Sequence, residues 1–143
     1  MATYFFDSSA LVKLYHPESG SAKVQAIFSE SGRRVVISRL AVVEMRSALA
    51  TKGRMGTLSA AAEAALVARF QADVASGAIA VFAVTDFNYR QAEQLIDRHG
   101  RQCRLRALDS LQLAVALDLL DQHVIEQLVA ADQVLCDVAT LEG

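Results

Sequence analysis

Hydrophobic and polar positions alternate along this chain in blocks that predict alternating strands and helices. Short apolar runs rich in β-branched and aromatic residues predict buried strands, which fall at residues 3–6, 35–37, 78–84 and 125–130. Apolar residues at helical spacing, or a high alanine content, predict helices at residues 9–15, 21–30, 40–52, 59–76, 86–98, 111–120 and 133–140. Gly53 is expected to end the third of these helices, and the stretch 125–130 also fits a continuation of the preceding helix. Strands alternating with helices, without hairpin signals, predict an α/β fold around a parallel sheet.

Composition predicts a well-packed globular protein. With 143 residues, 53% of them hydrophobic, the chain is expected to form a single domain over residues 1–143. Its apolar runs stay shorter than the roughly 18 residues of a membrane span, and its first residues do not resemble a secretory signal. Cys103 and Cys136 are too few for a disulfide framework or a zinc knuckle. We therefore expect a cytoplasmic protein with reduced thiols and no membrane segment.

The charge balance restricts how the chain can bind nucleic acid. Its net charge is −2, whereas proteins that hold nucleic acid by electrostatics alone are strongly basic. Metal ions or local arginine clusters would have to offset the acidic residues. One such cluster, Arg98, Arg101, Arg104 and Arg106, leads directly into Asp109. These arginines either hold RNA phosphates or form an ordinary solvated connector.

Four carboxylates lie among apolar neighbours in the sequence: Asp7, Glu44, Asp109 and Asp132. Each has a structural interpretation when taken alone. Asp7 and Asp132 can cap the helices that follow them, Asp109 opens a capping-box pattern with Gln112, and Glu44 can face solvent. Three of the four, however, follow strands or begin helices at one edge of the predicted sheet. Convergence there is not predicted by capping, and ligands bind at this edge in open α/β sheets.

Electrostatics indicates what such a convergence would be for. Two carboxylates about 4 Å apart repel by roughly 4 kcal/mol at an effective dielectric constant near 20. A gathered set would raise the pKa values of its members unless a cation lay among them. Oxygen ligands favour Mg²⁺ or Mn²⁺, which can activate water for in-line displacement at phosphorus.

The motifs around these acids resemble those of a known family. They are Phe6-Asp7-Ser8-Ser9-Ala10-Leu11, Val43-Glu44-Met45, the run from Leu105 to Ala114 that contains Asp109-Ser110-Leu111-Gln112, and Ala131-Asp132-Gln133-Val134-Leu135. In this order they resemble the successive motifs of PIN domains, and in particular the VapC-type toxins of prokaryotic toxin–antitoxin pairs. The resemblance covers residues 6 to 135, and its first and third motifs are the specific ones. It implies a three-layer α/β/α domain with a central, mainly parallel sheet of four to five strands.

The resemblance also implies an activity, an endoribonuclease that depends on Mg²⁺ or Mn²⁺. Asp7, Glu44, Asp109 and Asp132 would then be the catalytic and metal-binding acids, with Asp7 and Asp109 as the surest ligands. Ser9 would support Asp7 by hydrogen bonding, and capping of the next helix would fall to Ser8 or Ser9. Relatives usually dimerise, cut structured RNA such as tRNA, and are silenced by a cognate antitoxin, so RNA, an antitoxin and a homodimer are the expected partners.

Two departures from the family pattern are visible. Ala130 stands where relatives often carry Ser or Thr, which bears on the assignment of Asp132. The chain also stops at Gly143, where relatives commonly add a short final strand.

Other enzyme classes fit less well. Phosphatases with an aspartyl nucleophile need a second acid two residues after the first, where this chain has Ser9. Receiver domains need a pair of acids after the first strand, and neither G-x-G-x-x-G nor a P-loop is present. A nuclease acting on DNA and a non-catalytic PIN-like interaction domain remain as alternatives.

Overall fold

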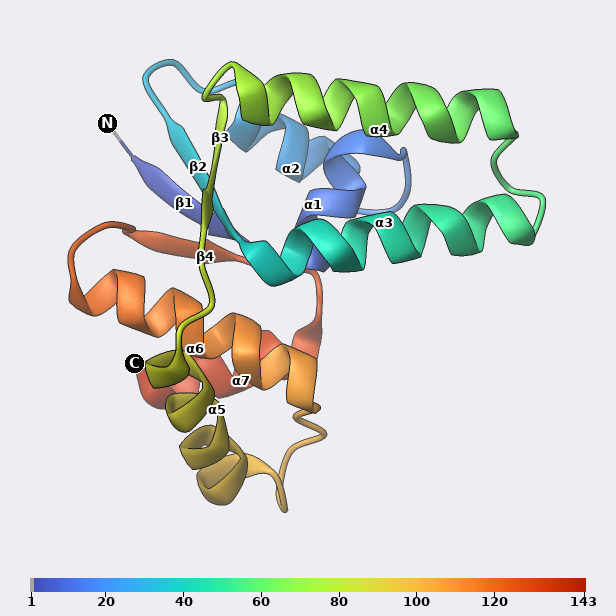
Figure 1. Ribbon diagram of the computed structural model, residues 1–143. Coiled ribbons are helices and arrows are strands. Elements are labelled where there is room, and N and C mark those ends of the chain that lie inside the picture. The colour runs from blue at the N-terminus through green and yellow to red at the C-terminus, as the bar shows by residue number, and fades with distance from the viewer. Residues whose placement is uncertain (1) are drawn as a thin grey trace.

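The structure is a computed structural model that describes residues 2–143, and a parallel four-stranded sheet lies at its centre (Figure 1). Its strands are β1 (Thr3–Phe6), β2 (Arg34–Ser38), β3 (Ile79–Phe82) and β4 (Gln127–Val129). They lie in the order β3-β2-β1-β4, and β1 pairs with both β2 and β4. The expected mainly parallel sheet of four to five strands is confirmed, and the ambiguous stretch 125–130 contains a strand.

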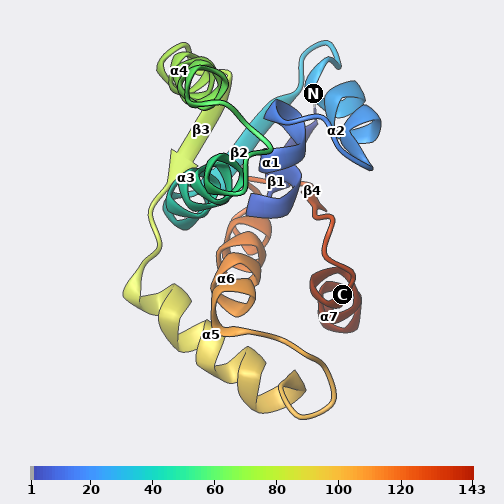
Figure 2. The same cartoon turned by 90° about the vertical axis from the view of Figure 1, so that its right-hand side faces the viewer.

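Seven helices flank this sheet in the described part of the chain. They are α1 (Ser8–Tyr15), α2 (Ser21–Phe28), α3 (Arg39–Arg54), α4 (Ala60–Ala75), α5 (Asp86–His99), α6 (Ala107–Asp121) and α7 (Gln133–Glu142). Helices α1 to α4 lie on one side of the sheet and α5 to α7 on the other, as Figures 1 and 2 show. The expected three-layer α/β/α arrangement is therefore confirmed.

Alternation along the strands explains the two apolar layers. Tyr4 and Phe6 of β1 pack in the layer beneath α1 to α4, whereas Phe5 between them packs with Val115 of α6. Because both faces of β1 are covered, the strand reads as a continuous apolar run. Helix α6 packs between the sheet, α5 and α7, which explains why it is apolar almost all round.

Two helix boundaries differ from the expectations. Helix α3 continues through Gly53 to Arg54, and the chain turns at Gly56 instead, where φ of 80° favours glycine. Helix α6 begins at Ala107 with Arg106 as its N-cap, so Asp109 already lies inside the first turn. The Asp109–Gln112 capping box was thus a wrong interpretation, because Asp109 is not the residue at the helix boundary.

Within residues 2–143, none of the helices is long and apolar enough to cross a membrane. Cys103 and Cys136 are free thiols, as expected.

The parallel sheet brings three strand ends to one edge. Strands β1, β2 and β4 end at Phe6, Ser38 and Val129, and each leads within a few residues into a helix. The backbone N–H of Asp7 donates to the carbonyl of Val129 (3.2 Å), which ties the exits of β1 and β4 together. This edge of the sheet positions the candidate site.

Candidate functional site

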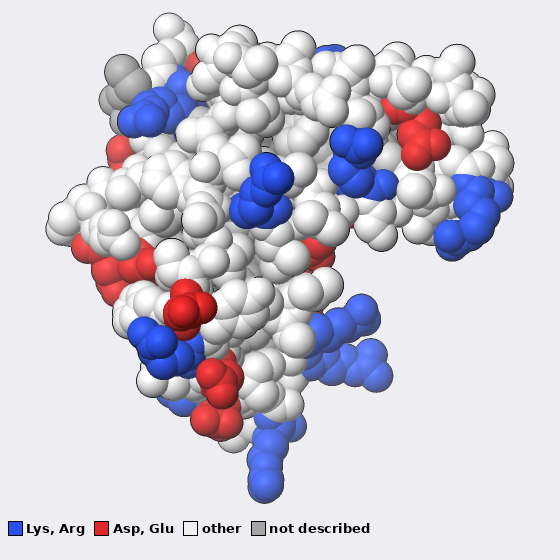
Figure 3. All heavy atoms as spheres, in the orientation of Figure 1, with Lys and Arg blue, Asp and Glu red and all other residues white. Residues whose placement is uncertain are grey.

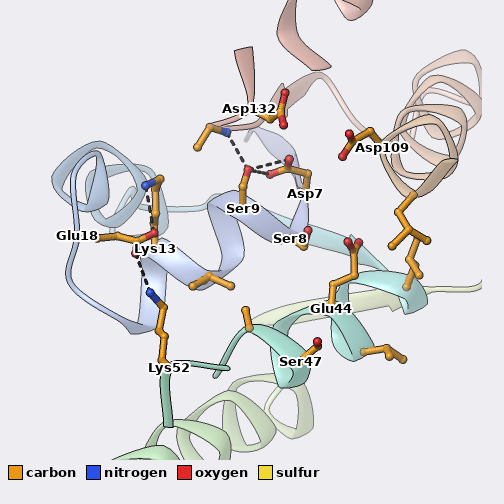
Figure 4. A pocket seen from close by; sticks show the side chains of 16 residues that line it. Asp7, Ser8, Ser9, Lys13, Glu18, Glu44, Ser47, Lys52, Asp109 and Asp132 are labelled. Atoms are coloured by element: carbon orange, nitrogen blue, oxygen red, sulfur yellow. Dashed lines mark hydrogen bonds and ion pairs between the residues drawn. The ribbon is translucent and has the colours of Figure 1, made fainter. Parts of the chain in front are cut away.

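A cleft of about 780 Å³ opens at the carboxyl ends of the strands. It is lined by all four carboxylates singled out in the sequence, Asp7, Glu44, Asp109 and Asp132. We call this cavity the acidic cleft. Figure 4 shows the four side chains reaching it from different elements: the β1–α1 junction, α3, α6 and the start of α7. The predicted gathering of these acids at one sheet edge is therefore present.

Asp7 is the most buried of these acids, with 3% of its surface exposed. It follows β1 directly and occupies the N-cap position of α1, where its Oδ1 accepts the N–H of Ala10 (2.9 Å). The expectation that Ser8 or Ser9 would cap this helix was wrong, because both lie inside its first turn. Asp7 thus combines capping with a position in the acidic cleft.

Ser9 holds the Asp7 carboxylate, as expected. Its hydroxyl lies 2.7 and 2.8 Å from the two carboxylate oxygens of Asp7 and donates to them. The same hydroxyl accepts the backbone N–H of Ala131 (3.0 Å), which lies beside Asp132. Ser9 therefore links the exit of β4 to Asp7 and fixes two walls of the cleft.

Burial and mutual repulsion raise the pKa values of two acids in the cleft. Burial raises the pKa of Asp7 to about 6, although hydrogen bonds from Ala10 and Ser9 oppose this rise and the neighbouring Asp132 and Asp109 add to it. Burial also raises the pKa of Asp109, with Asp132 adding to the shift and Arg106 opposing it. A cation in the cleft would reverse both effects.

Asp132 has two roles in the geometry. It is the N-cap of α7 and accepts the N–H of Leu135 (3.0 Å), as the capping interpretation predicted. Its carboxylate nevertheless lines the acidic cleft close enough to raise the pKa values of Asp7 and Asp109. Asp132 lines the cleft although Ala130 stands where relatives often carry Ser or Thr.

Glu44 is held from behind by a residue that the sequence interpretation assigned to a helix cap. Nε2 of the buried Gln112 donates to Oε1 of Glu44 (2.8 Å), and Oε1 of Gln112 accepts the hydroxyl of Ser38 (2.8 Å). Ser38 also caps α3 by accepting the N–H of Ala41. The amide therefore has one fixed orientation, with its N–H directed at Glu44. The sequence held one signal that could have identified Gln112 as part of the site: it is the one polar residue in an apolar run from Leu111 to Leu117.

The four carboxylates line one cavity without forming a ready-made cage. Among residues 2–143, no three His, Cys, Asp or Glu side chains are grouped closely enough to ligate one ion. Mg²⁺ does not require such a cage, since it keeps several waters and is held by one or two carboxylates together with substrate phosphates. The all-oxygen donor set therefore fits Mg²⁺ or Mn²⁺ bound partly through water.

The expected arginine cluster divides into two parts. Arg98 is engaged by Glu142 in two hydrogen bonds of 3.1 and 2.9 Å. Arg101, Arg104 and Arg106 are exposed in the connection between α5 and α6, and they are absent from the lining of the acidic cleft. On the face shown in Figure 3, basic side chains project outward where α5 joins α6.

Comparison with known proteins identifies the fold. A family model of the PIN domain matches residues 4–141. No curated protein matches the sequence. Among solved structures, VapC20 of Mycobacterium tuberculosis, described as a sarcin–ricin loop cleaving toxin, superposes with a TM-score of 0.69 at 18% identity, over 94% of this chain and 93% of that one.

Two further structures show the same fold. FitAcB from Neisseria gonorrhoeae gives a TM-score of 0.61 at 18% identity, over 96% of this chain and 93% of that one. VapBC2 from Rickettsia felis, solved bound to a DNA fragment from its promoter, gives 0.56 at 11% identity, over 91% and 99%.

Proposed function

The chain belongs to the PIN domain family, and from this premise we propose that it is a Mg²⁺- or Mn²⁺-dependent endoribonuclease, the toxin of a VapBC-type toxin–antitoxin pair. One observation carries the proposal: four carboxylates from four separate segments line a single cleft at the carboxyl edge of the sheet. Helix capping accounts for Asp7 and Asp132. It does not account for Glu44 and Asp109, which lie within helices and face the same cleft.

We assign separate roles to the four acids and to the residues that orient them. We assign Asp7 and Asp109 to direct contact with the ion, and Glu44 and Asp132 to contact with it directly or through water. A bound divalent ion would supply an activated water and charge stabilisation for in-line displacement at phosphorus. Ser9 keeps the Asp7 carboxylate oriented, and Gln112 does the same for Glu44. A bound ion would reduce the repulsion between the carboxylates of the acidic cleft and the phosphates of the RNA.

The substrate and partners follow from the same proposal. VapC20 is described as a toxin that cleaves the sarcin–ricin loop, and VapBC2 as bound to a DNA fragment from its promoter. By analogy we propose a structured RNA, such as tRNA, as substrate, a cognate antitoxin as inhibitor, a homodimer as the assembly and the cytoplasm as the location. The alternatives are a nuclease acting on DNA and a PIN-like interaction domain without catalysis.

Cleavage of a labelled structured RNA by the purified protein tests the function. We expect cleavage with Mg²⁺ or Mn²⁺ and none in excess EDTA, with activity restored when the ion is added back. A single-stranded and a duplex DNA of matched length, run in parallel, test the DNA alternative. Cleavage that continues in EDTA would contradict the metal mechanism. Inertness toward every nucleic acid, together with no Mn²⁺ binding by calorimetry, would favour the interaction domain.

The exposed arginines are expected to contribute to RNA affinity. We propose that Arg101, Arg104 and Arg106 contact phosphates outside the cleft. Replacement of both Arg101 and Arg104 by Ala should weaken RNA binding. It should also make the fall of log K with log salt less steep, by about one to two units. Fluorescence anisotropy at several salt concentrations measures this. Arg98→Ala is the matched control, because Arg98 is already paired with Glu142. Unchanged slopes in the double variant would contradict the assignment.

Removal of the amide behind Glu44 should weaken metal binding. In Gln112→Met the side-chain length is kept, but the donor to Glu44 is lost together with the acceptor for the Ser38 hydroxyl. Partners that orient metal ligands are typically worth about 10- to 100-fold in metal affinity or activity, and we expect a loss in the lower part of that range, measured as the Mn²⁺ dissociation constant by calorimetry. Gln122→Met is the control, because Gln122 Nε2 donates to Asp118 at the same distance of 2.8 Å, outside the lining of the cleft. Equal effects of the two substitutions would show that Gln112 does not position Glu44.

A further inference from the structure

The acidic cleft has a second end with the opposite charge. Its lining continues to Lys13 of α1, Glu18 of the α1–α2 connection and Lys52 of α3. Nζ of Lys13 lies 3.1 Å from Oε1 of Glu18, and Nζ of Lys52 lies 3.3 Å from Oε2 of the same residue. In Figure 4 these three side chains form one group, and Glu44, Asp109 and Asp132 lie on the other side of the cavity. We call Lys13, Glu18 and Lys52 the lysine bridge.

The two ammonium groups of the lysine bridge retain bonding capacity. Each Nζ carries three N–H donors. Lys13 uses one for Glu18 and one for the carbonyl of Ser19 (2.6 Å), and Lys52 uses one for Glu18. Within residues 2–143, half of the six donors therefore have no protein acceptor. Both side chains are nonetheless largely shielded, with 17% and 25% of their surfaces exposed, so they are held at the cleft wall and do not sweep through solvent.

The carboxylate of Glu18 occupies the position that an anion would take between the lysines. Burial raises the pKa of Glu18, but hydrogen bonds from Lys13 and Lys52 outweigh it and lower the pKa below its ordinary value. One carboxylate bridges two cations, which leaves the group with a net positive charge. Two lysines that share a single anion, with donors to spare, have the composition of a phosphate site.

We propose that Lys13 and Lys52 form a subsite for a backbone phosphate of the RNA strand, next to the phosphate that is cut at the acidic end. This inference rests on the proposed function and names substrate-contacting residues for it. Lys13 lies six residues after Asp7 and Lys52 eight after Glu44, a rise of roughly 9 to 12 Å along their helices at 1.5 Å per residue. The subsite is thus far enough from the acids to hold a different phosphate of the same strand. Glu18 pre-orients the lysines and competes with the phosphate for them.

A purely structural role of the lysine bridge predicts the opposite change in RNA affinity for one variant, Glu18→Gln. If the lysine bridge only fastened the α1–α2 connection to α3, loss of Glu18 would act in the same direction as loss of either lysine, because Glu18 belongs to both ion pairs and each lysine to one of them. If the lysines bind phosphate, Lys13→Met and Lys52→Met weaken RNA binding, whereas Glu18→Gln strengthens it by removing the competing charge. The Glu18→Gln variant therefore separates the two roles.

RNA affinity across a salt series tests the subsite. We measure anisotropy of a labelled single-stranded RNA in EDTA, where no cleavage is expected, together with KM and kcat in Mg²⁺ and the melting temperature of each variant. We expect Lys13→Met and Lys52→Met each to weaken binding about 5- to 10-fold. Each should also make the fall of log K with log salt less steep, by about one unit or slightly less. KM should rise more than kcat falls. Glu18→Gln should tighten binding about two- to fivefold at low salt, since one repelling charge is removed. Lys23→Met, an exposed lysine of α2 outside the cleft lining, should match the wild type.

The outcomes separate this inference from the proposed function. Wild-type cleavage of RNA with unchanged affinity in both lysine variants would overturn the subsite and leave the nuclease intact. So would a Glu18→Gln variant that loses as much affinity as the lysine variants. A wild-type protein that neither binds nor cuts RNA would overturn both proposals. A lysine variant with a lowered melting temperature is judged by the salt slope, since a smaller folded fraction changes apparent affinity without changing that slope.

Discussion

Asp7→Asn is expected to lower the rate of RNA cleavage by roughly 10³-fold or more, which corresponds to about 4 kcal/mol of lost transition-state stabilisation. Asparagine keeps an oxygen that can accept the N–H of Ala10 and the hydroxyl of Ser9, so the start of α1 is preserved. What it removes is the negative charge at the most buried point of the acidic cleft. If that charge holds the metal ion, the loss appears in kcat and in Mn²⁺ affinity together.

Single-turnover cleavage with saturating protein measures this effect without interference from product release. Asp97→Asn, the same substitution at an exposed position of α5, is the control and should retain full activity. Asp109→Asn should give a loss of similar size, because Asp109 lies in the same cleft. An Asp7→Asn protein that still binds Mn²⁺ and cuts RNA at a rate within tenfold of wild type would falsify the assignment of Asp7.

Much of this site could be predicted from local sequence because its acids follow directly from strand and helix signals. An apolar run that ends at Asp7 specifies a buried strand with a carboxylate at its exit, and a parallel sheet brings such exits together. Asp132 could be placed in the same way after β4, and the structure locates both residues in one cleft. The apolar pattern was also enough to predict the layers. The continuous apolar runs of β1 and α6 indicate elements covered on all sides, and both faces of β1 and almost all sides of α6 are buried.

The parts that sequence reasoning missed depend on contacts between distant segments. Gln112 is 68 residues from Glu44 and 74 from Ser38, so no local pattern reveals that its amide joins them. Lys13 and Lys52 meet only through Glu18, across the packing of α1 on α3. The choice of Asp7 over Ser8 as helix cap was decided by where β1 stops, and element boundaries are the least predictable part of a fold.

The same Asp7→Asn substitution is expected to stabilise the metal-free protein at neutral pH. Burial raises the pKa of Asp7 from 3.8 to about 6, so the folded state binds this proton more tightly than the unfolded state does. Stability from this group is fully present below pH 3.8, falls as the pH rises toward 6, and is absent above that value. At 1.36 kcal/mol per pKa unit, the ionised carboxylate costs on the order of 2–3 kcal/mol at pH 7.5.

Asparagine carries no charge to lose, so the variant should avoid that cost. Urea unfolding in EDTA should show Asp7→Asn more stable than wild type by about 2 kcal/mol at pH 7.5, with the difference shrinking toward zero near pH 4. Asp97→Asn should change stability by less than about 0.5 kcal/mol at both pH values, because its side chain is exposed. Added Mn²⁺ should stabilise wild type and not the variant, narrowing the gap at neutral pH. A gap that is independent of pH would mean that the Asp7 charge is not what destabilises the metal-free fold, and the case for a cation at this position would lose its electrostatic basis.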